Sequence, residues 1–204
     1  MTLRLAGSTS GYTEIDASAV AGSNIIQLPA GNGSAYQVVR NGATAGSLEF
    51  ADKIVSGTAV ASTSGTTIDF TGIPSWVKRV TVMFNGVSTN GTSNLQIQIG
   101  ISSGFETTGY ASACFDAGSS FGATTGFLIS GSVAANNLRS GSMVLSSFTG
   151  NTWINHGVLS RTDTSTGSCS SGSKTLSGTL DRVRITTVNG TDTFDAGSIN
   201  ILYE

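Results

Sequence analysis

Residues 24–52, NIIQLPAGNGSAYQVVRNGATAGSLEFAD, constrain the fold of this chain more than any other segment. Three short apolar runs, 25–28, 37–39 and 48–50, alternate with tight turns that contain glycine. Such runs are shorter than typical strands and can bury little of their own apolar surface. We therefore expect the segment to need identical neighbours or a host surface, which favours a symmetric assembly over a free-standing enzyme.

The composition predicts a folded all-β chain. The 204 residues include 27 glycines, 31 serines and 27 threonines, whereas charged residues make up only 11%. Disordered chains are usually rich in charge and proline and poor in β-branched and aromatic residues. This chain has two prolines, a mean hydropathy of +0.13 and many alternating Val, Ile and Phe positions, so we expect ordered β-structure.

The charge pattern argues against nucleic acid and membrane as partners. The formal net charge is −2 and the basic residues are scattered, whereas nucleic-acid binding depends on clustered Lys and Arg. No apolar run approaches the ~20 residues of a membrane helix. The N-terminal sequence MTLRLAGSTSGY lacks the apolar core of a signal peptide. We expect a soluble protein without a Sec-type export signal.

Two cysteines, Cys114 and Cys169, lie far apart in segments rich in serine and glycine. They could form a disulfide or remain two unpaired thiols, and the sequence leaves both alternatives open. A structural zinc site needs about four N or S ligands, and the chain has only these two cysteines and one histidine. We expect no metal and no cofactor.

From residue 53 onward, longer runs alternate with period two, which is typical of half-buried strands. Run 76–85 places Val80, Val82 and Phe84 on one face and Arg79 on the other.

In run 94–101, Gln96 and Gln98 are expected to face solvent, opposite an inward face of Leu95, Ile97, Ile99 and Ile101. Further strands are expected at 66–70, 126–133, 142–148, 152–160, 174–180, 182–188 and 198–203.

Asn-Gly pairs at 85–86, 90–91 and 189–190 predict hairpins, because type I′ turns require positive φ. No stretch shows a sustained helical period. The pattern predicts an antiparallel β-sandwich resembling a jelly roll over residues 53–204. Residues 1–52 are expected to form an extended N-terminal arm of short strands for attachment and trimerisation.

The arm resembles the N-terminal cassette of bacteriophage tail-fibre and related virion-surface proteins, in which a pattern of the form TLP…G…QVL…NG…G.L.F/W recurs. The matching residues are Leu28-Pro29, Gly31, Gln37-Val38-Val39, Asn41-Gly42, Gly46, Leu48 and Phe50, and Arg40 departs from the pattern. The C-terminal block 177–204 also resembles the end of small phage structural proteins. Each resemblance covers about a seventh of the chain.

The resemblance implies a homotrimer in the virion, assembled in the host cytoplasm, with three arms intertwined along a threefold axis. The arm would contact other virion proteins through Ile25, Leu28, Val38, Val39, Leu48 and Phe50. Edge strands with unpaired backbone groups are a hazard in a monomer and become useful when copies pair.

Catalytic motifs are weak in this chain. Gly118–Gly122 matches G-x-S-x-G, but that motif requires a strand-to-helix turn, and no helix is expected there. The lone histidine, His156, lies beside Trp153 in an expected strand, where a structural or surface role is commoner than catalysis. Asp192 and Asp195 could offer oxygen ligands to a cation, but turn formation explains them more simply. We expect no enzymatic activity.

Four aromatic residues in the Gly/Ser-rich interval 102–126 are the candidate contacts for a host-surface glycan or a partner: Phe105, Tyr110, Phe115 and Phe121. Exposed rings among small hydroxyl residues can stack on sugars. The alternative, which we favour, is that these rings anchor the interval on the core or on a neighbouring subunit.

Three function classes follow. The first is a short trimeric tail fibre or receptor-binding component that serves in host attachment. The alternative is a capsid cement or decoration protein, which would use the same arm to lie over capsid subunits. A polysaccharide-degrading enzyme is the least favoured.

Overall fold

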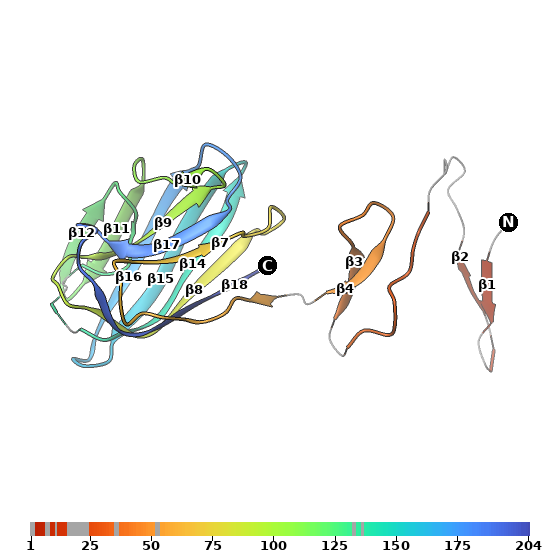
Figure 1. Ribbon diagram of the computed structural model, residues 1–204, viewed down its shortest axis with the longest axis horizontal. Helices are drawn as coiled ribbons and strands as arrows, with labels where there is room; N and C mark the ends of the chain where they lie inside the picture. Colours follow the sequence, from red (N-terminus) through yellow and green to blue (C-terminus); the bar gives the residue numbers. More distant parts are fainter. Residues whose placement is uncertain are drawn as a thin grey trace. The chain divides into compact units, whose positions relative to one another are not determined.

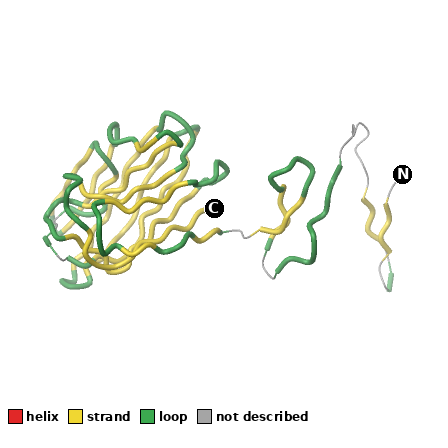
Figure 2. Tube along the Cα trace, viewed as in Figure 1, coloured by secondary structure: helices red, strands yellow, loops and turns green. Residues whose placement is uncertain are grey.

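The computed structural model describes residues 3–6, 9–10, 12–15, 25–34, 37–51, 54–131, 134–135 and 137–204. These residues form eighteen strands and no helix, and the strands pair with one another antiparallel (Figures 1 and 2). This confirms the all-β prediction. The described part of the chain thus contains no helix of the length and apolarity needed to cross a membrane. The chain divides into two compact units, Met1–Lys53 and Ile54–Glu204.

The N-terminal unit contains two small hairpins. Strand β1 (Leu3–Ala6) pairs with β2 (Tyr12–Ile15), and β3 (Val38–Asn41) pairs with β4 (Leu48–Ala51). Residues 25–28 lie beside the second hairpin: Gln27 donates its N–H to the carbonyl of Gly46 at 2.8 Å. Gly46 has φ +82°, and a Cβ there would overlap the carbonyl oxygen of Ile25, so glycine is required at this crossing.

The C-terminal unit contains two sheets. The larger sheet has nine strands in the order β12-β11-β16-β15-β14-β8-β18-β5, with β6 also paired to β18. Its strands are β5 (Val55–Ser56), β6 (Val60–Ala61), β8 (Arg79–Thr89), β11 (Ala111–Asp116), β12 (Ser119–Ala123), β14 (Arg139–Thr149), β15 (Thr152–Arg161), β16 (Thr166–Thr175) and β18 (Phe194–Tyr203). The smaller sheet has the order β10-β9-β17-β7, with β13 also paired to β9. Its strands are β7 (Thr67–Thr71), β9 (Leu95–Ile101), β10 (Gly104–Phe105), β13 (Phe127–Leu128) and β17 (Arg182–Thr187).

The strand order is that of a jelly roll with insertions. Successive strands β7, β8 and β9 alternate between the two sheets, as do β13 and β14 and then β17 and β18. Strand β17 lies between β7 and β9, while β18 lies between β8 and β5, which is the double Greek-key arrangement. Strands β11, β12, β15 and β16 extend the larger sheet beyond this frame. Figure 1 shows the two sheets stacked as layers.

The core fills the space between the two layers. Val80, Val82 and Phe84 of β8 point inward and are buried, as the alternation of that run predicts. Ile97 and Ile99 of β9 meet them from the smaller sheet, and Leu95 is buried with them. Because each sheet is apolar on its inner face, neither could be stable without the other.

The opposite face of β9 departs from the sequence-based expectation. Gln96 and Gln98 are buried, not solvent-exposed. Gln98 Nε2 donates to the carbonyl of Thr125 at 3.0 Å, and Thr125 Oγ1 donates to Gln96 Oε1 at 2.9 Å. The prediction was wrong because the interval after β9 folds back over this face and satisfies both amides.

The Asn-Gly pairs do not form the expected hairpins. The pair at 85–86 lies inside β8, where Gly86 has φ +63° and the register with β14 and β18 shifts, so it is a β-bulge. The pairs at 90–91 and 189–190 connect strands of different sheets. The tight hairpin at 117–118 instead uses Ala-Gly, with both residues at positive φ.

Candidate functional site

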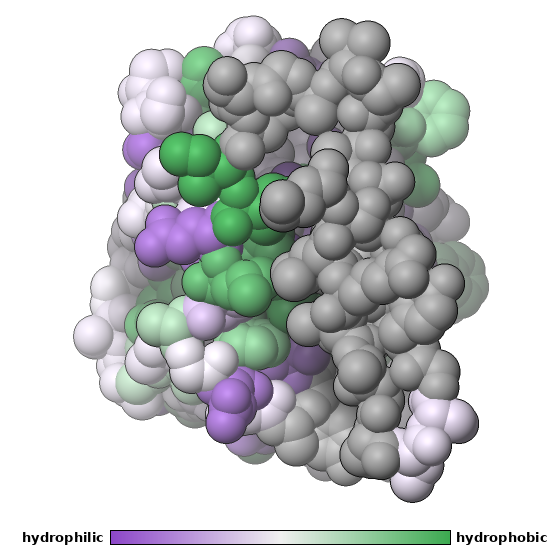
Figure 3. All heavy atoms as spheres, turned by 90° about the vertical axis from the view of Figure 1, so that its right-hand side faces the viewer, coloured by the Kyte–Doolittle hydropathy of each residue, from purple (hydrophilic) through white to green (hydrophobic). Residues whose placement is uncertain are grey.

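The apolar residues of the N-terminal unit are the first candidate surface. Ile25, Ile26 and Leu28 are 81%, 72% and 75% exposed, and Val39 is also exposed. Hydrophobic residues reach the surface among hydrophilic ones in the space-filling view of Figure 3. Exposed apolar side chains that lie this close together in the chain favour an interaction surface.

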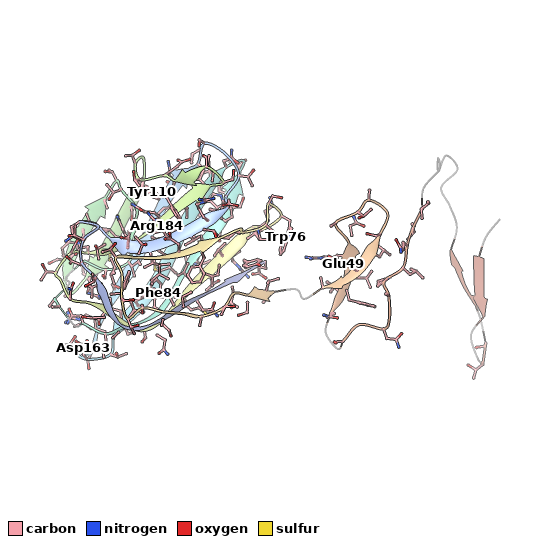
Figure 4. All side chains as sticks on the ribbon, in the orientation of Figure 1. Glu49, Trp76, Phe84, Tyr110, Asp163 and Arg184 are labelled. Atoms are coloured by element: carbon pink, nitrogen blue, oxygen red, sulfur yellow. The ribbon has the colours of Figure 1, made fainter. Side chains whose placement is uncertain are left out.

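The remaining arm residues are half-buried within the unit. Val38, Leu48 and Phe50 lie on the β3–β4 hairpin, and the Phe50 ring packs so closely on Gly33 that a side chain there would collide with it. Across the same hairpin, Arg40 Nε lies 2.9 Å from Glu49 Oε1 (Figure 4). Both side chains are well exposed, so this ion pair contributes little stability. The exposed apolar residues of the unit are therefore Val39 on the hairpin and Ile25, Ile26 and Leu28 beside it.

Tyr110 is a core residue. Its hydroxyl accepts the N–H of Ile99 at 2.8 Å and donates to the carbonyl of Glu106 at 2.8 Å. Its ring packs edge-to-face on Phe127, with centroids 4.9 Å apart. Burial raises the pKa of Tyr110 above its ordinary value. Tyr110 thus anchors its interval on the core, which is the alternative that we favour from the sequence, and its ring is too buried to contact a glycan.

Phe105 lies beside two arginines of β17. The guanidinium carbon of Arg184 is 4.1 Å from the centroid of its ring, and that of Arg182 is 5.6 Å away. Arg184 also holds both oxygens of Asp69 at 2.8 and 2.7 Å, and these hydrogen bonds raise its pKa (Figure 4). The guanidinium of Arg184 thus covers one face of the half-buried Phe105 ring.

Phe115 and Phe121 point to opposite sides of the larger sheet. Cys114 and Phe121 are directly opposite one another in the β11–β12 register, and Phe115 faces Ser120. Phe121 is half-buried and packs on Gly131, whereas Phe115 is 51% exposed on the solvent side. The four predicted contact residues are therefore distributed over different layers and form no common site.

A cavity of about 230 Å³ opens on the solvent side of the larger sheet. His156, Val144 and Leu202 line it, together with Arg79, Tyr203 and Glu204. Arg79 and Glu204 form an ion pair, and Tyr203 packs on Trp76 with centroids 5.9 Å apart (Figure 4). A cavity with both aliphatic and polar walls can contact the apolar and the polar groups of a ligand.

The geometry does not assemble a hydrolytic triad. Segment 118–122 leads into and forms most of β12, and no helix follows it. Ser120 of that segment is separated from His156 of β15 by strands β11 and β16. Segment 167–175, GSCSSGSKT, differs from the phosphate-loop pattern G-x-x-x-x-G-K-[ST] by one serine between the second glycine and the lysine, and it lies entirely within β16. Neither motif has the strand-to-helix turn that its chemistry requires.

The two cysteines are unpaired. Cys114 faces Ser170 and Cys169 faces Phe115 across β11 and β16, so the two thiols point to opposite sides of one sheet. Cys114 is buried and Cys169 is exposed. Burial raises the pKa of Cys114 to about 12, which makes it a poor nucleophile at neutral pH.

Sequence reasoning missed a buried ion pair. Arg139 Nη1 lies 3.4 Å from Asp116 Oδ2, and the side chains are 1% and 0% exposed. The same carboxylate oxygen accepts the N–H of Gly131 at 3.1 Å. Burial lowers the pKa of Arg139 from its ordinary value. The pair ties β11 to β14, and no short-range pattern in the sequence signals it.

A second pair lies at the edge of the same unit. Lys174 Nζ is 2.6 Å from Glu106 Oε2, and Ser177 donates both its N–H and its hydroxyl to Glu106 Oε1 at 2.8 Å. Partial burial would raise the pKa of Glu106, but these hydrogen bonds outweigh it and lower the pKa. These contacts hold the Glu106 carboxylate in place, so its role is structural.

Of the two aspartates that could offer ligands to a cation, Asp192 caps turns, whereas Asp195 lies in β18 and bonds a residue of β8. Asp192 accepts the N–H of Ser93 at 2.9 Å and the amide of Asn189 at 2.6 Å, while Asp195 accepts the hydroxyl of Ser88. Within the described ranges, no group of three or more His, Cys, Asp or Glu could hold a metal ion. Comparison with protein-family models, curated proteins and solved structures yields no match.

Proposed function

We propose that the chain is a non-enzymatic structural protein of a bacteriophage virion, a short trimeric tail fibre or receptor-binding component. The observation that carries this proposal is the exposed apolar run of the N-terminal unit, Ile25, Ile26 and Leu28. The unit forms hairpins and still leaves these apolar side chains exposed to water. Binding another protein through them would remove this apolar surface from water. Their position within the cassette that resembles phage attachment arms makes other virion proteins the partner.

The C-terminal unit supports a binding role over a catalytic one. Its most buried charged groups, Arg139, Asp116 and Lys174, lie in ion pairs that hold strands together. Its histidine lines a cavity together with an arginine and a glutamate that already bind one another. Rigid β-structure that presents a surface suits a virion component, which must persist outside the cell.

Immunogold electron microscopy of purified phage particles, with antibody against the full chain, tests the proposal. Label at the tail supports a fibre or receptor-binding role. Label distributed over the capsid, with many copies in each particle, would replace this role by capsid decoration. Particles without label would contradict both.

A complementation experiment tests the role of the arm. The double variant Ile25→Ser, Leu28→Ser, supplied to particles that lack the protein, should fail to be incorporated. Val188→Ser changes an exposed valine of the C-terminal unit and serves as the matched control. Equal incorporation of both variants would show that the apolar run is not the attachment surface.

A further inference from the structure

The solvent side of the larger sheet is a continuous face that runs from β18 to β12, and we call it the outer face. Its central row, read across the paired strands, consists of Leu202, Thr81, Val144, His156, Ser171 and Ala113. A parallel row on one side contains Val158, Cys169 and Phe115, and the row on the other side contains Ile154. Val158 is 61% exposed, and Ile154 and Phe115 are exposed as well.

The outer face carries almost no charge. Among the described residues of these three rows, only Arg79 and Glu204 have a formal charge, and these two lie at a corner and form an ion pair with one another. The opposite side of the molecule differs, because β7 and β17 present Asp69, Arg182 and Arg184 there. Two copies of one chain carry the same charges, so a nearly neutral face can meet another copy without like-charge repulsion.

The outer face has a ridge and two hollows, and the ridge of one copy is complementary to a hollow of another. Strand β15 carries the exposed side chains of Ile154 and Val158 as a ridge. On one side of it lies the cavity lined by Val144 and Leu202. On the other side, a hollow of about 360 Å³ is lined by Phe115 and Cys169, among others. A ridge between two hollows lets one copy seat its ridge in a hollow of the next, which is a heterologous contact that can close into a ring.

The size of the outer face is also sufficient. It spans seven strands, from β18 to β12. With strands about 4.8 Å apart and rows about 7 Å apart, its plane covers roughly 600 Å². Side-chain relief adds to this area, which brings it near the roughly 800 Å² that each partner buries in an interface of standard size.

We propose that the outer face binds a second copy of this chain. Near-neutral charge, ridge-and-hollow relief and sufficient area all favour an identical partner over a charged ligand. The inference rests on the proposed function only for the number of copies, three. Self-association through this face would hold equally for a protein with another role.

The test compares two aspartate variants of the full chain by sedimentation velocity. The wild-type protein should have a sedimentation coefficient that corresponds to three times the 20.7 kDa mass of the chain. Val158→Asp places a charge in the middle of the ridge and should reduce the mass to that of one chain. Val188→Asp, on another exposed valine that lies outside the outer face, should keep the wild-type mass. Circular dichroism verifies that both variants remain folded.

Thiol labelling of the unmutated protein provides a second measurement that does not depend on a variant. Cys169 is exposed in the single chain but lies in the proposed interface, so it should react several-fold more slowly with a maleimide when the protein is assembled than when it is diluted to single chains. Buried Cys114 should remain unreactive in both states.

The outcomes separate the two proposals. A wild type that remains a single chain at all concentrations overturns the interface, while virion labelling still decides the proposed function. An oligomer that survives Val158→Asp and leaves Cys169 fully reactive shows that copies associate elsewhere, and it also overturns the inference.

Discussion

Isoleucine has opposite environments in the two units: Ile25 of the N-terminal unit is 81% exposed, whereas Ile97 of the C-terminal unit is fully buried. Ile97 lies within β9, and Ile25 lies two residues before Gln27, which bonds the turn of the β3–β4 hairpin. The difference comes from layering, because the C-terminal unit has two sheets that cover each other and the described N-terminal hairpins have no second layer. Strand formation alone therefore does not create a core.

Separating the units would test this comparison most directly. A fragment of residues 54–204 should unfold in one cooperative transition, because its core and ion pairs are internal. A fragment of residues 1–53 should show no cooperative transition when it is alone and dilute, since hairpins without a packed layer are marginal at best. Denaturation followed by circular dichroism measures both. A cooperative transition in the short fragment would break the comparison.

Within the C-terminal unit, breaking the buried ion pair between Asp116 and Arg139 should have the next largest effect, a loss of stability. Asp116→Ala leaves the Arg139 guanidinium buried without its carboxylate and should lower the free energy of unfolding by about 3–5 kcal/mol. The double variant Asp116→Ala, Arg139→Met should recover most of this loss, because neither charge of the pair then remains buried. Urea denaturation of the three proteins measures it. A loss below about 1 kcal/mol in the single variant would show that the pair contributes little.

Replacing Glu106 should have a smaller effect on the free energy of unfolding, and this effect should depend on pH. Its pKa is lower in the folded protein than in the unfolded chain, so its stabilisation is present above about pH 4.3 and is lost as the pH falls through the folded pKa. Glu106→Gln should lower stability by about 1.5 kcal/mol at pH 7. Denaturation of wild type and variant at pH 7 and pH 3 should show the difference shrinking. A difference that is constant with pH would rule out the ionised carboxylate as its source.

The smallest change in the free energy of unfolding is expected for a substitution in the N-terminal unit. Ile25→Ser should change the free energy of unfolding of the single chain by less than about 0.5 kcal/mol, because an exposed side chain loses no packing. The matched change Ile97→Ser, in the core, should be strongly destabilising. Thermal denaturation of both variants compares them. Similar losses would show that the two environments are not as different as the exposure suggests.

The sequence predicted the long strands of the core well. Strands β8 and β9 alternate apolar and polar residues, and the inward residues Val82 and Ile97 are buried as expected. Strand β16 was missed over most of its length, because it reads TGSCSSGSKT and its inward side chains are Ser168, Ser170 and Lys174. Ser168 donates to the carbonyl of Ile129 at 2.9 Å, so hydrogen bonding rather than hydrophobicity places this strand inward.

The candidate surfaces were less predictable. The glycine and serine of interval 102–126 predict no strand, yet the interval contains β10, β11 and β12. Once Phe115 and Phe121 lie on paired strands, the registry of those strands decides which side each ring faces. Registry depends on long-range pairing with β16, which no local pattern contains.

The position of β18 has a consequence for how the protein is made. This last strand of the jelly roll lies between β8 and β5, which are synthesised near the start of the C-terminal unit. While a ribosome is still translating the middle of the unit, β8 has an open edge that can pair with a neighbouring nascent chain. Folding must wait for the end of the unit, so nascent chains on one polysome would need chaperones, or one another, to keep this edge from misassembly.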